Sequence, residues 1–524
     1  MTDSWLVLTP PIIVLTMALI TKKLNPSLLT GIICAALIAM DFNPLGSAKL
    51  VGNTFWSTIT DPNNICIYLF LIALGTVVAL VIKTGGAAAF TQFASKKLKN
   101  KKSAETTSIL FSFSVFIDDY LSNSTVGHVM RPLTDQFKIA RAKLAFLVHS
   151  IATPLVVIAP VSGWSAMITQ RLGEAKITTQ LSDAPRILAS PYMVYLKSIP
   201  FIFYSFLMLA SVWFIVRRRI SYGPMGAHEA VAEKTGNLFG GGKEVTVSIE
   251  KTKKASGALK DLFIPIAMLA SSITLATLFG DQLVSIFGLK GIVGPSFFAL
   301  FFAGTLTMCI SLLFSLRRKK ITTSNVQKTV MGGIELMGDP IIMLFLASIL
   351  GAIVQDQLLT GDYLAKIMVG NVGLSLIPLM MFIVSAIMAV ATGTSWGTIA
   401  IMVPIAIPMI IKLSQVALPA DVASITLLLP VIGAVLSGAV CGDHISPVSE
   451  TTIMASSSAG STPVDHATTQ FFYAVPAIIG TCLAFLLSGI LTTHGSFVGS
   501  VAPLAISLIT CLVILFAFDK IGKK

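Results

Sequence analysis

Charged residues are scarce in this chain. Of its 524 residues, 12% are charged and 54% are hydrophobic, whereas about 25% of the residues in an ordinary soluble domain are charged. A soluble protein of this length needs more charge to cover its surface, so the composition excludes a cytosolic enzyme, a disordered chain and a secreted disulfide scaffold. Apolar runs of about 20 residues predict instead an all-α polytopic membrane protein, because a helix of that length spans a bilayer.

The motifs of several other protein classes are also missing. The six cysteines are scattered singly, without the CxxC or CxxH spacing of a zinc site or a disulfide framework. No GxxxxGK(S/T) loop occurs, so ATP-driven pumping has no support. We therefore expect no enzymatic activity, no cofactor other than Na⁺ and H⁺ as transported or coupling ions, and no nucleic acid partner despite the net charge of +13.

The basic residues predict the orientation in the membrane. Residues 5–20 lack the basic start of a cleaved signal and are predicted as a first membrane helix. Two apolar stretches are broken, 106–130 by DDYLSNSTVG (118–127) and 374–412 by ATGTSWGT (391–398). If the N-terminus is outside and both stretches are re-entrant hairpins, 29 of the 37 Lys and Arg residues lie in loops facing the cytoplasm. These loops are 21–24, 83–104, 131–143, 217–260, 317–339 and 519–524.

Such an excess marks the cytoplasmic side. We therefore predict a multi-pass protein of the inner (cytoplasmic) membrane, with about eleven transmembrane helices, two hairpins and a cytoplasmic C-terminus. The predicted parts are an N-terminal helix (1–24), repeat one (25–216), a cytoplasmic linker (217–260), a connecting helix (261–291), repeat two (292–518) and a basic tail (519–524).

The two halves resemble each other weakly. STVG at 124–127 matches TSWG at 394–397, and PVS at 160–162 matches PVS at 447–449. Because one hairpin opens to the cytoplasm and the other to the outside, the matched elements run in opposite directions. This predicts the inverted-topology repeat of secondary transporters, with the binding site at the broken helices.

The few acids at membrane depth lie beside these breaks. An ionisable group in hydrocarbon is costly and normally faces a cavity in which it has a function. Asp118 and Asp119 are adjacent, and a cation or a proton would relieve the repulsion between their carboxylates. The alternative is a helix-terminal acid pair bonded to local backbone. The predicted Na⁺ ligands are Asp118, Asp119, Asn123 and Asp443.

Short polar side chains next to these acids are further candidates for ion or substrate binding. At the first tip and the break at 159–165, they are Ser122, Asn123, Ser124, Thr125 and Ser162. At the second tip, they are Thr392, Gly393, Thr394 and Ser395. At the break at 441–452, they are His444, Ser446, Ser449 and Glu450, beside Asp443. Turn formation is the alternative for the hydroxyls, and Glu450 could simply end the last break near the cytoplasm.

A histidine and two tryptophans also lie within or beside the apolar segments. His149 is predicted to be a hydrogen-bonded helix residue, with proton relay as the alternative, because an imidazole titrates near neutral pH. Trp164 and Trp396 lie beside two breaks and could serve either gating or packing.

Three segments resemble the signature segments of the NhaC-type Na⁺/H⁺ antiporters, in the ion transporter superfamily. They are FIDDYLSNSTVGHVMRP (116–132), ATGTSWGT (391–398) and CGDHISPVSETTIMAS (441–456). The resemblance, over about residues 60–490, implies hairpin tips that bracket the site, an elevator-like movement of a transport domain against a scaffold, and often a homodimer. The SNST sequence is also similar to tips of sodium-coupled dicarboxylate carriers.

The sequence therefore predicts a Na⁺/H⁺ antiporter with elevator-type alternating access in the lipid bilayer. The alternative is a Na⁺- or H⁺-coupled carrier or exchanger of a small organic anion or amino acid, because NhaC-like proteins include members that exchange organic acids. Arg131 is the cation nearest to the tips in that case. A channel or receptor is disfavoured by the duplicated broken helices.

Overall fold

The computed structural model describes residues 4–21, 23–86, 89, 93, 99–181, 185–242, 257–368, 372–447, 449–492 and 496–522. Helices form nearly all of it. The two strands in this part, β1 (Ile177–Thr178) and β2 (Ile187–Leu188), pair in parallel with Ile177 opposite Ile187. The long apolar helices are α4 (Pro62–Thr84), α8 (Arg141–Ile158), α13 (Lys260–Leu278), α15 (Pro295–Arg317), α16 (Thr323–Ala352), α18 (Ile377–Thr392), α19 (Ser395–Ser414), α20 (Leu428–Ile445), α22 (Pro463–Leu491) and α23 (Ser496–Gly522).

Shorter helices precede the long ones or lie between them. They are α1 (Thr9–Thr21), α2 (Leu24–Ala39), α3 (Pro44–Thr60), α6 (Lys101–Ser114), α7 (Asp119–Gln136), α9 (Gly163–Glu174), α10 (Pro191–Ser198), α11 (Phe203–Arg218), α12 (Gly223–Thr235), α14 (Gly280–Ile286), α17 (Thr360–Met368) and α21 (Glu450–Ala459). Within the described ranges, ten helices are long and apolar enough to cross a membrane, or eleven if the segment from α10 onward, bent by 48°, counts as one span.

The all-α polytopic class is confirmed, but the set of long helices differs from the prediction. α1 and α2 are shorter apolar helices, whereas both arms of the predicted second hairpin, α18 and α19, are long enough to cross a membrane. The predicted cytoplasmic linker contains α12, which packs on α8 and α22. The inverted repeat and the re-entrant course of the hairpins stay predictions.

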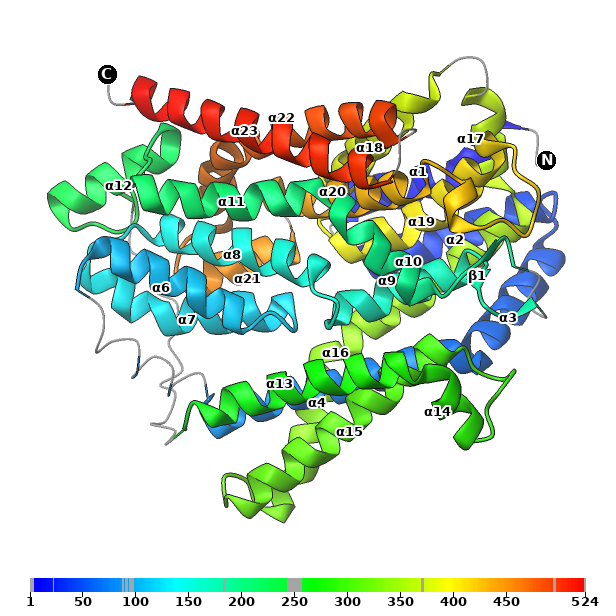
Figure 1. Ribbon diagram of the computed structural model, residues 1–524, viewed down its shortest axis with the longest axis horizontal. Coiled ribbons are helices and arrows are strands. Elements are labelled where there is room, and N and C mark those ends of the chain that lie inside the picture. Colours follow the sequence, from blue (N-terminus) through cyan, green and yellow to red (C-terminus); the bar gives the residue numbers. More distant parts are fainter. Residues whose placement is uncertain are drawn as a thin grey trace.

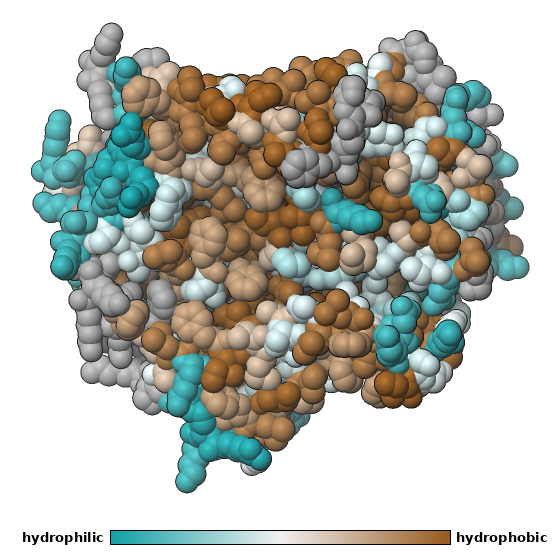
Figure 2. Space-filling view, in the orientation of Figure 1, coloured by the Kyte–Doolittle hydropathy of each residue, from teal (hydrophilic) through white to brown (hydrophobic). Residues whose placement is uncertain are grey.

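The surface polarity fits a protein that crosses a bilayer. Hydrophobic residues cover the middle of the visible face and hydrophilic residues gather toward both ends (Figure 2). α12 and the C-terminus lie at one end, whereas α3 and α14 lie at the other (Figure 1). Outer helices expose large apolar side chains such as Leu278, Leu313 and Ile509, as expected where side chains face lipid.

The helices form two groups. α4, α13 and α15 lie side by side along the lower edge of Figure 1, and α16 packs against α4. The other group contains α7, α8, α11, α20, α21 and α22, which pack on one another. α16 also contacts α19, which in turn packs on α20, so α16 and α19 link the two groups.

The first broken stretch differs from its prediction. A break was expected at 118–127, but α7 begins at Asp119, and only 115–118 separate it from α6. SNST therefore lies inside α7, where the backbone N–H of Ser122 donates to the carbonyl of Asp118 (3.0 Å). Serine and asparagine favour turns locally, but packing against α8 and α21 overrides that preference here.

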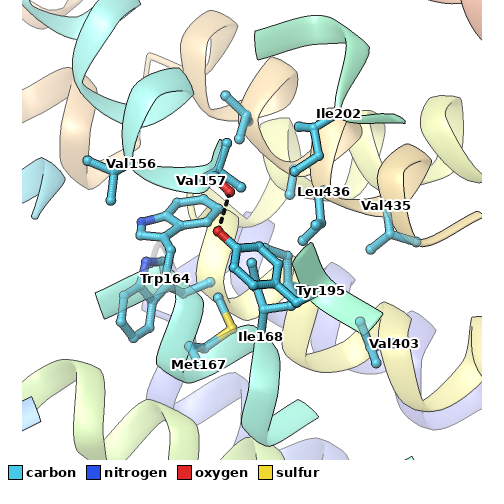
Figure 3. Packing of buried hydrophobic residues seen from close by; sticks show 14 of the residues in the cluster. Val156, Val157, Trp164, Met167, Ile168, Tyr195, Ile202, Val403, Val435 and Leu436 are labelled. Carbon is cyan, nitrogen blue, oxygen red and sulfur yellow. Dashed lines mark hydrogen bonds between the residues drawn. The ribbon is translucent and has the colours of Figure 1, made fainter. Parts of the chain in front are cut away.

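The break after α8 falls where it was expected. Residues 159–162 separate α8 from α9, within the predicted stretch 159–165. Figure 3 shows Trp164 and Tyr195 packed among apolar side chains of α19 and α20, with the Tyr195 hydroxyl donating to the carbonyl of Val157 (2.9 Å). This bond satisfies a carbonyl that the end of a helix leaves unpaired.

The two breaks of the second half are short. α18 ends at Thr392 and is followed by the capping residue Gly393, whose φ of 69° is left-handed, and Thr394 caps α19. The break expected at 441–452 is shorter than predicted, because α20 continues to Ile445 and α21 begins at Glu450.

Glycines hold α20 close to α18. A side chain at Gly438 would overlap the carbonyl of Phe382, and a Cβ at Gly442 would lie 2.6 Å from the Cβ of Ala389. Small residues four positions apart are typical of closely packed membrane helices. The contact places Asp443, the next residue of α20, near the second tip.

Candidate functional site

One face of α7 carries polar side chains without partners. Asp119, Ser122 and Asn123 are spaced i, i+3 and i+4, so they share a face of the helix, and each is at most 1% exposed. Asp119 Oδ1, Ser122 Oγ and both side-chain polar atoms of Asn123 have no hydrogen-bond partner in the described part of the chain. Buried polar atoms are normally paired, so this face offers a carboxylate and neutral oxygens to a ligand.

The local structure of these predicted site residues differs from the expectation. They belong to the first turns of a helix instead of a loop at the hairpin tip. Asp118 is as deeply buried as Asp119 and precedes the helix. Thr125 is half-buried. The predicted ligand Ser124 has its side chain outside the described residues.

Packing against α21 positions this face. The hydroxyl of Ser458 donates to the carbonyl of Asn123 (2.7 Å). A side chain at Gly127, one turn later, would overlap Ser458. Only glycine therefore lets α7 and α21 approach this closely.

A second acidic centre surrounds Asp443, at the end of α20. Its carboxylate accepts hydrogen bonds from the hydroxyls of Thr451 (2.6 Å) and Ser449, and lies 3.2 Å from Nε2 of His149. Asp443 is 1% exposed. Both carboxylate oxygens thus have partners, unlike Oδ1 of Asp119.

His149 continues this centre into a chain of buried groups. Its Nδ1 lies 3.0 Å from Nε2 of His466 and 3.1 Å from Nε2 of Gln470. Gln470 also donates to the carbonyl of His444 (2.8 Å), and the hydroxyl of Tyr204 lies 3.0 Å from Nδ1 of His444. All three histidines are fully buried. A donor on one ring nitrogen and an acceptor on the other would let such a chain hold or pass a proton.

The sequence did not predict all members of this hydrogen-bonded chain of buried groups. His149 does form hydrogen bonds within a helix bundle, as expected, but its partner Asp443 was not predicted. His466 and Gln470 were overlooked entirely. The available signal was the position of His466 at the start of a long apolar run in a chain with only six histidines.

The threonine hydroxyls of the second tip form hydrogen bonds to nearby backbone groups. Thr394 Oγ1 accepts the N–H of Gly397 (3.3 Å) as a helix cap, and Thr392 Oγ1 donates to the carbonyl of Met388 (2.9 Å). The carbonyl of Gly393 accepts the N–H of Glu450 (3.4 Å). Ser395, also predicted as a ligand, is buried.

Ser162 and Ser446 also bond to backbone. Ser162 Oγ donates to the carbonyl of Val156 (3.0 Å) and caps α9, and Ser446 Oγ donates to the carbonyl of Val390 (2.9 Å). These bonds match the alternative in which the hydroxyls stabilise local backbone and do not bind an ion. Glu450, in contrast, is exposed and accepts a hydrogen bond from Tyr120 (2.5 Å).

The four predicted Na⁺ ligands are divided between these centres. No group of three or more His, Cys, Asp or Glu side chains is arranged to hold one metal ion in the described ranges. Asp443 belongs to the hydrogen-bonded centre, whereas Asp119 and Asn123 belong to the face of α7 with unpartnered atoms.

The tryptophans beside the breaks touch each other. The rings of Trp164 and Trp396 lie 6.2 Å apart with an interplanar angle of 80°. Each follows its helix cap, Ser162 or Thr394, by two residues. The edge-to-face contact joins the starts of α9 and α19.

The second tip, Asp443, His444 and α21 fall within one family model. The model of the Na⁺/H⁺ antiporter family matches residues 186–490, more than half of the chain. The chain belongs to the Na⁺/H⁺ antiporter family. This confirms the resemblance drawn from the three segments and makes the protein a membrane transporter.

Relatives of this antiporter-family chain cover it to different extents. A Haemophilus influenzae protein of uncharacterised function is 32% identical over 528 residues, 98% of this chain and 95% of the relative. The malate-2H⁺/Na⁺-lactate antiporter of Bacillus subtilis is 35% identical over 116 residues, 22% of each chain. The YdaH transporter of Alcanivorax borkumensis shares the fold, with a TM-score of 0.52 and 12% identity over 86% of this chain and 89% of that one.

Proposed function

We propose that the chain exchanges Na⁺ for H⁺, with Na⁺ bound on the face of α7 and the proton carried by Asp443 and its histidine chain. The observation that carries the proposal is the set of unpartnered, buried oxygens of Asp119, Ser122 and Asn123. Carboxylate, hydroxyl and amide oxygens suit a hard cation such as Na⁺.

Electrostatics would couple the two ligands. The charges of Asp118 and Asp443 both act on Asp119. A cation on α7 therefore weakens the attraction of Asp443 for a proton, and a proton at Asp443 weakens the attraction of Asp119 for Na⁺. Such mutual weakening makes the two ligands alternate on one carrier.

The contacts between broken helices support alternating access. α7 packs on α21, and α9 packs on α19. In the predicted repeat, α7 corresponds to α19, and α9 corresponds to α21. The contact between α7 and α21 is therefore equivalent to the contact between α19 and α9. We propose that these helices move as an elevator against α4, α13, α15 and α16, in an inner-membrane homodimer with the N-terminus outside and the C-terminus in the cytoplasm.

A second candidate function is the coupled exchange of a small organic acid. It is supported by the partial match to the malate-2H⁺/Na⁺-lactate antiporter. The two candidates share the coupling centre and differ in whether an organic solute must be present.

Purified protein in liposomes with an internal pH dye separates the two. We expect Na⁺ added outside, without organic solute, to change the internal pH, and Asp362→Asn, away from both centres, to behave like the native chain. Movement of protons only when lactate or malate is also present would replace the first candidate by the second. No movement in either case would contradict both.

A further inference from the structure

A fully buried arginine joins the end of α9 to α16. The guanidinium of Arg171 donates to the carbonyl of Leu344 (3.1 Å) and to the hydroxyl of Ser348 (2.8 Å), one turn apart on α16. The same hydroxyl lies 2.8 Å from Oε1 of Glu174, and the side-chain amide of Gln355 donates to the carbonyl of Glu174 (3.0 Å). These polar contacts connect the last turn of α9 to the second half of α16 and the turn that follows it.

The charge of Arg171 is compensated on its own helix. Glu174 lies three residues later in α9, with 2.7 Å between Nη1 of Arg171 and Oε2 of Glu174. The partners on α16, a carbonyl and a hydroxyl, are uncharged. If α9 leaves α16, the ion pair therefore leaves with it, and no buried charge loses its partner, which would be strongly destabilising. The contacts can hold α9 in place and still be broken.

The segment that follows α9 is joined to the same group of helices. The hydroxyl of Ser190, which caps α10, lies 2.8 Å from the hydroxyl of Ser296 at the start of α15. The side-chain amide of Gln180 donates to the carbonyl of Val293 (3.4 Å), just before α15. β1 and α14, which lie beside these contacts in the sequence, are at the end of the molecule opposite to α12 (Figure 1). That end is predicted to face the outside.

The two halves of α16 differ in how they are enclosed. Every residue from 347 to 351 is buried. In the first half, Glu335 and Asp339 are exposed one turn apart, and no atom beyond its neighbours and the nearby backbone of its own helix lies within 4 Å of the Cβ position of Gly338. The packing around α16 is therefore closed at the end that carries Ser348 and open toward its start, next to the basic loop predicted to face the cytoplasm.

We propose that Arg171, Glu174 and Ser348 form a latch, which holds α9 against α16 in one end state of the transport cycle and opens once in each cycle. The structure then represents the state that is closed toward the outside. The proposal rests on the elevator movement proposed above, and it names the contacts that this movement has to break. Arg171 is in this view a positioning residue for α9 and not a ligand of the transported ion.

A cysteine on α16 can report whether the latch is open. Met343 is 5% exposed, and its Sδ lies 3.9 Å from the hydroxyl of Thr394, at the start of α19. Movement of α19 and α9 away from α16 would uncover this position. Met343→Cys is therefore introduced into the full-length protein with its six native cysteines replaced by alanine. The measurement is the rate of labelling by a membrane-impermeant maleimide in detergent.

Ser348→Ala removes the hydroxyl that contacts both Arg171 and Glu174. We expect the labelling rate to rise at least about fivefold, because the lost hydrogen bonds shift the equilibrium toward the open state. Ser348→Thr keeps the hydroxyl and should label like the parent. Ser311→Ala is the matched control, since this buried hydroxyl on α15 has no hydrogen-bond partner in the described part of the chain. Unchanged labelling in Ser348→Ala, or an equal rise in Ser311→Ala, would overturn the proposal.

Two further measurements guard against effects of misfolding. Cys441 is 1% exposed in α20, so a chain that keeps this cysteine alone should label slowly with or without Ser348→Ala. If labelling of Cys441 rises, Ser348→Ala is unfolded and Gln355→Leu decides. This variant removes a separate contact to Glu174 and should raise labelling of Met343→Cys about threefold. An unchanged rate would overturn the proposal.

The labelling experiment requires no ion movement, so it is independent of the test of the proposed function. A raised labelling rate in Ser348→Ala, together with a native chain that does not exchange Na⁺ for H⁺ in liposomes, would contradict the exchange and support the latch. Unchanged labelling together with active exchange would overturn the latch alone.

Discussion

Asp119 and Asp443 are the same residue type and equally buried, yet their surroundings are opposite. Asp119 lies in the first turn of α7, where the helix dipole stabilises a negative charge. Asp443 lies in the last turn of α20, where the dipole disfavours it, and Ser449, Thr451 and His149 surround its carboxylate. A carboxylate that the backbone already stabilises can leave an oxygen for a ligand. A carboxylate at the wrong end of a helix needs fixed partners.

Asp119→Asn tests this difference most severely. Removing one charged ligand from a buried site should cost about 3 kcal/mol or more, which weakens Na⁺ binding at least about a hundredfold. Na⁺-dependent thermal stabilisation of the purified protein measures this. Asp443→Asn, in contrast, should retain Na⁺ binding and lose proton coupling. If both variants lose Na⁺ binding equally, the separation of the two centres is wrong.

His149→Gln should have the next largest effect. The amide can keep hydrogen bonds to Asp443 and Thr451, but it cannot take up a proton. A positioned proton-transfer side chain typically contributes about 10²–10⁴-fold to a rate, so we expect the rate of Na⁺-driven proton movement in liposomes to fall at least about tenfold. Na⁺ binding should stay within about twofold of the native value. His228→Gln, within α12, is the matched control. An unchanged rate in His149→Gln would show that the histidine chain takes no part in the mechanism.

Gly442→Ala tests how Asp443 is held in place. The new methyl group would meet Ala389 on α18, and overpacking of this kind costs about 1–3 kcal/mol. Thermal unfolding of the purified protein should show the loss. Gly338→Ala on α16 is the control, since no atom beyond its neighbours and the nearby backbone of its own helix lies within 4 Å of its Cβ position. Equal stability of the two variants would show that α18 and α20 can separate without cost.

Thr394→Ala should have the smallest effect. Loss of the cap of α19 should cost about 1 kcal/mol of stability, with Na⁺ affinity unchanged and with rescue by Thr394→Ser. Thermal unfolding and Na⁺ titration together check this. A large loss of Na⁺ affinity would show instead that the second tip contributes to Na⁺ binding.

The sequence predicted the parts of the fold that local chemistry controls. Pro160 and Gly393 mark real breaks, because proline and glycine disfavour continuous helix. The break at 118–127 was placed wrongly, since Ser122 and Asn123 favour turns alone but are buried here, where α7 packs on α21.

The acids of the candidate site could be predicted from the sequence, but the residues that contact them could not. Asp119 and Asp443 stood out as charges in apolar surroundings. His149 and Asp443 meet across 294 residues, and His466 meets His149 across 317. No local pattern encodes such a contact, because it arises only when whole helices pack.

The bond from Ser458 to Asn123 has a consequence for biosynthesis. The two residues are 335 positions apart, so the ribosome completes α7 long before α21 is made. Meanwhile, a segment with two adjacent acids and a buried amide lacks the surface against which it finally packs. The polar face of α7 can therefore be covered in its final form only after the second half of the chain has entered the membrane.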